Sequence, residues 1–246
     1  MPDRTRQHFA EELERVEEQG LGGLDLVVGQ IDRVLEALEH QDVELAAMVI
    51  GNDDLIDGRY LEVHQELLSL FALQAPVATD LRQVIAAVKM ISEIERSGDL
   101  AVNICKAARR IYGHDLDPRL RGTITRMAEQ AQQLFRFAID AYVESDVPLA
   151  AAIRDMDDML DRLHAEFIQQ IFESHAAGRL DLQVGVQLAL VARFYERIGD
   201  HAVNIGERVR FLVTGWLPEH KGAARYRTRA DDTGEMERQP STDADG

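Results

Sequence analysis

The chain has 246 residues, carries 44 acidic and 27 basic side chains for a net charge of −17, and contains one cysteine, Cys105. Such an acidic surface repels phosphate backbones and anionic lipid, which excludes nucleic acid as an expected direct partner and leaves the membrane only an indirect role, through another protein. One cysteine excludes an intramolecular disulfide and a cysteine-rich zinc site, and indicates a buried, inert thiol.

Helical periodicity runs through the chain and strand signals are scarce, so the sequence predicts an all-α protein. Breakers and N-cap residues delimit six expected helices, at 6–40, 42–74, 77–112, 117–144, 147–176 and 181–215. Gly20, Gly22 and Gly23 leave room for a kink in the first. No apolar run approaches the roughly 18 residues of a membrane span, and the N-terminus lacks a signal peptide, so we expect a cytoplasmic protein.

The polar segment 218–246 is expected to be a disordered tail. Its basic cluster could dock on the acidic body and comprises Arg225, Arg227 and Arg229.

An internal repeat organises the rest of the chain. Residues 95–105 (ERSGDLAVNIC) and 196–206 (ERIGDHAVNIG) agree at eight of eleven positions. Upstream, residues 52–63 (NDDLIDGRYLEV) align with 156–167 (MDDMLDRLHAEF). The sequence therefore predicts two copies of a three-helix bundle, over 1–114 and 115–217.

Each copy carries two acidic residues spaced four apart on its second helix and two more on its third. Four such pairs are about what chance allows in so acidic a chain, so their placement within the repeat is the evidence. Residues four apart share a helix face, and packing the two helices together brings four carboxylates within reach of one another. The predicted first cluster is Asp53, Asp57, Glu95 and Asp99, and the second is Asp157, Asp161, Glu196 and Asp200.

A bound cation would relieve the repulsion within each cluster, and an all-oxygen donor set suits Mg²⁺, Mn²⁺, Ca²⁺ or Fe, with Zn²⁺ also allowed. Glycine before the last Asp leaves room for an ion or for a facing helix, and both interpretations stay open. The alternative for the whole set is a solvated acidic face paired with nearby arginines. Supporting residues are Gly98, Gly199, Asn103, Asn204, Arg96 and Arg197.

Catalytic signatures are missing from the sequence: it contains no Glu-x-x-His di-iron motif, phosphate-binding loop, nucleophile elbow or HExxH. His201 follows Asp200, but its counterpart is Leu100, so it falls outside a symmetric ligand set. A binder or adaptor is expected rather than an enzyme.

The residues resemble the PhoU family of phosphate-transport regulators over nearly all of 1–216. The resemblance rests on RTRQHFAEELERVEEQGLGGL, on LFALQAPVATDLRQVIAAVKMISEIERSGDLAVNI and on LALVARFYERIGDHAVNIGERV. It implies two three-helix bundles with pseudo-twofold symmetry, metal held by the acidic motifs as Fe, Zn, Mn or Mg, and a plausible homodimer.

The resemblance also implies negative regulation of phosphate uptake and of the phosphate-starvation response. The implied partners are the ATPase of the phosphate ABC transporter and a sensor histidine kinase. The first copy departs from the family pattern, with Leu100 in place of His and Ser97 in place of Ile, so its site is expected to differ in metal content or occupancy. A metal-free helical scaffold that docks basic partners is the alternative function.

Overall fold

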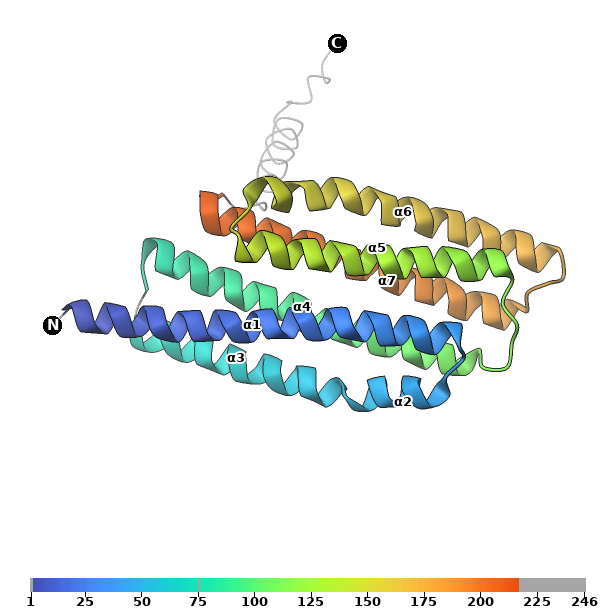
Figure 1. Ribbon diagram of the computed structural model, residues 1–246, viewed down its shortest axis with the longest axis horizontal. Coiled ribbons are helices and arrows are strands. Elements are labelled where there is room, and N and C mark those ends of the chain that lie inside the picture. The colour runs from blue at the N-terminus through green and yellow to red at the C-terminus, as the bar shows by residue number, and fades with distance from the viewer. Residues whose placement is uncertain (1, 75, 217–246) are drawn as a thin grey trace, which may run out of the picture.

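A computed structural model describes residues 2–74 and 76–216. Within these residues the chain forms only helices: α1 (Pro2–Glu39), α2 (Val43–Gly51), α3 (Asp53–Gln74), α4 (Ala78–Arg110), α5 (Pro118–Val143), α6 (Val147–Ala176) and α7 (Leu182–Thr214) (Figure 1). The all-α prediction is confirmed. No helix in the described part is long and apolar enough to cross a membrane. The predicted tail lies outside the described residues.

The single helix predicted over 42–74 is wrong, because the chain breaks at Asn52 into α2 and α3. Asn52 ends α2 and donates its backbone N–H to the carbonyls of Met48 and Val49. Gly51 and Asn52 both have low helix propensity, and the acidic start of α3 favours a new helix N-terminus. The second copy has Met156 at the matching position and runs through α6 without a break.

Aspartate caps begin four of the helices, as the boundary patterns indicated. The side chains of Asp42, Asp117, Asp146 and Asp181 accept hydrogen bonds from backbone N–H groups in the first turns of α2, α5, α6 and α7. Each cap satisfies donors that a helix start leaves unpaired.

The helices form two tandem bundles that lie side by side, α1–α4 below and α5–α7 above in Figure 1. Helices α4 and α7 make the most extensive contact between elements and join the two halves. One continuous apolar core spans both halves, with Ile104, Phe135 and Tyr195 fully buried in it. The helices that carry the repeated motifs therefore pack in a row, with α3 against α4, α4 against α7, and α7 against α6.

The glycines of α1 allow close packing and do not break the helix. A Cβ added to Gly20 would lie 3.3 Å from Met90 Cε, and one added to Gly23 would lie 3.2 Å from Ile94 Cγ2, both on α4. Helix α1 runs without a break from Pro2 to Glu39.

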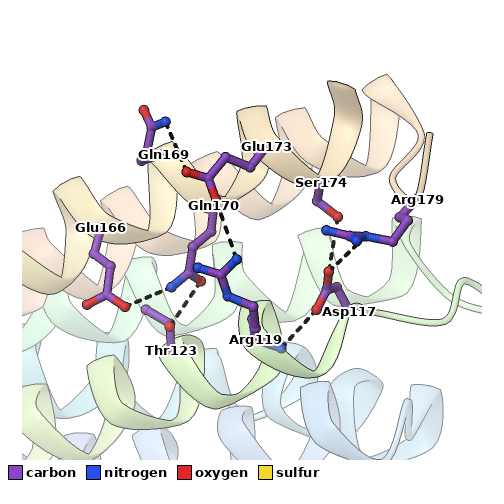
Figure 2. A network of polar contacts seen from close by, with 9 residues as sticks. All are labelled: Asp117, Arg119, Thr123, Glu166, Gln169, Gln170, Glu173, Ser174 and Arg179. Carbon is purple, nitrogen blue, oxygen red and sulfur yellow. Dashed lines mark hydrogen bonds and ion pairs between the residues drawn. The ribbon is translucent and has the colours of Figure 1, made fainter. Parts of the chain in front are cut away.

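A polar network ties the start of α5 to the end of α6 (Figure 2). Asp117 accepts from Arg119 N and from Ser174 Oγ and pairs with Arg179 at 3.4 Å. One turn on, Thr123 Oγ1 donates to Gln170 Oε1 at 3.1 Å. The network therefore connects the residue before α5 with the end of α6 and the loop that follows it.

Candidate metal centre

The first carboxylate cluster consists of Asp53 and Asp57 on α3 and of Glu95 and Asp99 on α4. Burial raises the pKa of Asp53, and the charges of Asp57 and Asp99 raise it further, while Lys106 lowers it. Burial followed by Asp99 and Asp57 also raises the pKa of Glu95. The structure therefore brings the four side chains close enough to repel one another.

The second carboxylate cluster consists of Asp157 and Asp161 on α6 and of Glu196 and Asp200 on α7. Its first member is more buried than Asp53, the equivalent position in the first cluster. Asp157 is only 9% exposed. Burial, together with the charges of Asp161 and Asp200, raises its pKa to about 7. The pKa of Glu196 is raised by burial and by Asp200, and lowered in part by its ion pair with Arg193. Burial also raises the pKa of Asp200.

Two buried oxygen atoms of the second cluster have no hydrogen-bond partner, Asp157 Oδ1 and Glu196 Oε2. A buried carboxylate oxygen without a partner is costly, because nothing replaces the water it has lost. Protonation or a cation would each relieve that cost. The oxygen donors match the hard and borderline ions expected from the sequence.

The motif glycines bring the helices close at both clusters. A Cβ at Gly199 would overlap Asp157 Oδ1 and would lie 2.6 Å from Leu160 Cδ2. A Cβ at Gly98 would lie 3.3 Å from two methyl groups of Ile56 and 3.7 Å from Gln30 Oε1. Close helix packing therefore accounts for both glycines. At Gly199, the space that a side chain would fill is occupied by Asp157, a candidate metal ligand.

The other predicted supporting residues flank the clusters. Asn103 and Asn204 are half-buried one turn beyond Asp99 and Asp200. Arg96 pairs with Glu93 at 3.4 Å, three residues earlier on α4, and its charge also lowers the pKa of Glu95.

Arg197 is half-buried, and its charge lowers the pKa of Asp200. The arginines therefore offset part of the negative charge at each cluster. The pKa values of Glu95 and Asp200 nevertheless remain raised, chiefly by burial.

Metal binding itself stays a prediction. Across residues 2–74 and 76–216, no three His, Cys, Asp or Glu side chains stand where they could already hold one ion. Binding would therefore require carboxylates to rotate toward one another. The unpartnered oxygens of Asp157 and Glu196 and the close approach at Gly199 fit such a group, and the repulsion within each cluster favours it.

Two buried polar features were missed by sequence reasoning. Gln30 on α1 is 5% exposed, and its Oε1 has no partner. Ser97 on α4 is fully buried and lies 2.8 Å from His201 Nδ1 on α7, across the interface between the halves. Departure from the family pattern at Ser97 was the only sequence signal for the second feature. His201 is buried at 3% exposure.

The model of the PhoU domain family matches residues 24–108 and again 124–209, once in each half. The chain belongs to the PhoU family. It is 38% identical over 195 residues to "Phosphate-specific transport system accessory protein PhoU homolog 1" of Mycobacterium tuberculosis, covering 79% of this chain and 87% of the relative. A Clostridium acetobutylicum PhoU homolog is 32% identical over 215 residues, covering 86% and 96%.

Solved PhoU structures share the fold. The crystal structure of PhoU from Pseudomonas aeruginosa matches with a TM-score of 0.80 at 30% identity, covering 85% of this chain and all of that one. PhoU from Streptococcus pneumoniae, described as a phosphate transport system regulatory protein, matches with a TM-score of 0.79 at 26% identity, covering 85% and 98%. These matches confirm the tandem-bundle, PhoU-like fold.

Proposed function

We propose that this PhoU-family protein is a metal-binding, non-catalytic negative regulator of phosphate uptake and of the phosphate-starvation response. It acts by contact with the ATPase of a phosphate ABC transporter and with a sensor histidine kinase, and it works as a homodimer. The names of its relatives, accessory proteins of phosphate-specific transport, support the transport role.

One observation carries the metal part of the proposal: each half of the fold sets four mutually repelling carboxylates on two adjacent helices. A cation would neutralise this repulsion and tie α3 to α4 and α6 to α7. Asp157 and Glu196, with their unpartnered oxygens, would hold the ion in the second half.

A metal-free scaffold is the second candidate, favoured by the absence of a preformed three-ligand group among the described residues. Elemental analysis of protein purified without chelator separates the two. We expect metal in stoichiometric amount, lost in the Asp99→Ala/Asp200→Ala double variant and retained in the matched control Asp155→Ala, an exposed residue on α6. Metal-free wild-type protein that still binds its partners would favour the scaffold.

The physiological role is tested by gene deletion in the source organism. We expect phosphate uptake and phosphatase expression to be derepressed in high phosphate, and complementation to restore repression. Normal repression in the deletion strain would contradict the regulator proposal, whatever metal the protein holds. Light scattering coupled to size exclusion tests the homodimer.

A further inference from the structure

A buried polar pair connects the two motif turns across the interface between the halves. Ser97 Oγ on α4 lies 2.8 Å from His201 Nδ1 on α7, and the two residues are 0% and 3% exposed. Ser97 also donates to the carbonyl of Glu93 at 2.7 Å. Because its one hydroxyl hydrogen serves that carbonyl, Ser97 accepts a hydrogen bond from the imidazole Nδ1–H.

Burial disfavours the protonated form of the His201 imidazole. Burial lowers the pKa of His201 to about 4, and the charges of Arg96 and Arg197 lower it further. Its Nε2 lies 3.8 Å from Glu93 Oε2, beyond hydrogen-bond reach. Loss of the contact with Ser97 would leave a buried imidazole N–H unpaired.

The placement of the pair relative to the carboxylate clusters gives it a second role. Ser97 lies between Glu95 and Asp99 in sequence, on the opposite side of the same helical turn, because two residues advance about 200° around a helix. His201 directly follows Asp200, and it is buried where Asp200 is exposed. The motif turn of α4 thus presents its carboxylates toward α3, and that of α7 presents its carboxylates toward α6. Each turn places one member of the Ser97–His201 pair in the interface between α4 and α7.

The pair is also asymmetric with respect to the repeat. The counterpart of Ser97 is Ile198, and the counterpart of His201 is Leu100, both apolar and buried. The polar contact thus occurs once, and the positions related to it by the repeat are occupied by aliphatic side chains. Interior side chains are close-packed, so a shift of one motif turn must be accommodated by the turn bonded to it.

We infer that Ser97 and His201 are positioning residues that couple the two carboxylate clusters, so that cation binding at one cluster changes the affinity of the other. The inference rests on the proposed metal function. Drawing Glu95 and Asp99 toward α3 moves the turn that holds Ser97. The hydrogen bond passes this movement to the turn that holds Asp200.

The test measures Mn²⁺ affinity at the second cluster by isothermal titration, with the first cluster intact or disabled by Asp99→Ala. We expect the dissociation constant to differ by about fivefold or more between these two proteins, in the range of ordinary allosteric coupling. In a Ser97→Ala background the same comparison should give less than a twofold difference. Leu100→Val, at the position equivalent to His201, serves as the control and should keep the full difference.

A second variant guards against misfolding of Ser97→Ala. His201→Asn places an amide donor near the site of Nδ1 and should retain coupling, whereas His201→Leu should lose it. Two occupied clusters with the same coupling in wild type and in Ser97→Ala would overturn this inference alone. Two occupied clusters with no coupling in wild type would do the same. No Mn²⁺ binding at either cluster would overturn it together with the metal part of the proposed function.

Discussion

The first and second carboxylate clusters share one motif but have different neighbours. In the second, Asp157 is 9% exposed and packs against Gly199, and the charges acting on it are those of other carboxylates. In the first, Asp53 is half-buried and Lys106 offsets part of the repulsion. The two copies of the repeat therefore share the spacing of their carboxylates but differ in the side chains around them. These surroundings determine how strongly each cluster favours a bound cation.

The largest expected difference concerns pH. Asp157 holds its proton up to about pH 7 in the folded protein but loses it near 3.8 when unfolded, so folding stability falls as pH rises between these values. In chelator, Asp157→Asn should therefore be more stable than wild type at pH 8 by ~4 kcal/mol, from the size of the pKa shift. The advantage should vanish near pH 4. Urea unfolding across this range measures it.

Asp155→Asn, on the exposed side of α6, is the matched control and should show no such pH dependence. The corresponding Asp53→Asn change should give a smaller gain, because Asp53 is less buried. A gain for Asp157→Asn that stays constant from pH 4 to pH 8 would contradict the assignment of the raised pKa to this carboxyl.

A second difference concerns the motif glycines. Gly199→Ala would force a methyl group against Asp157 and Leu160, and we expect it to destabilise the fold by about 2 kcal/mol, as overpacked cores do. A Cβ at Gly98 comes no closer than 3.3 Å to the methyl groups of Ile56 and 3.7 Å to Gln30 Oε1, and alanine favours the helix, so the effect of Gly98→Ala should stay within about 1 kcal/mol of zero. Equal losses of stability for Gly199→Ala and Gly98→Ala in chemical denaturation would contradict this expectation.

The smallest expected effect separates the cores beneath the two clusters. Gln30 lies beside Gly98, and Leu134 occupies the corresponding place beside Gly199. Since Gln30 Oε1 is buried without a partner, Gln30→Leu should raise the free energy of unfolding by about 1 kcal/mol. The reverse change, Leu134→Gln, should lower it. A loss of stability in Gln30→Leu would indicate that the amide has a partner or ligand in solution.

Helix type, the helix boundaries other than the one at Asn52, and the grouping of the carboxylates followed from local pattern. The aspartates at positions 42, 117, 146 and 181 mark helix starts in sequence as they do in the structure. The i,i+4 spacing and the repeat placed the acidic residues on facing helices because both signals are short-range or internal to the chain.

Two of the features that the sequence did not predict, the Ser97–His201 contact and the burial of Gln30, depend on packing register between distant segments. Ser97 and His201 are 104 residues apart, and nothing in either helix alone says that they meet. Gln30 lies on a third helix and looks like an ordinary surface position until its burial is known. The break at Asn52 is a local choice between two weak helix formers and a polar start, which propensity alone does not decide.

The break at Asn52 divides a helix in the first half that is continuous in the second half. The 30-residue α6 runs without interruption past Asp157, whereas the corresponding stretch is divided into α2 and α3 at Asn52, one residue before Asp53. A partner that pulls on α2 could therefore swing it without carrying α3 along, and a force on α6 would reach Asp157 directly. Amide exchange should accordingly be faster around residues 51–54 than through the equivalent stretch of α6.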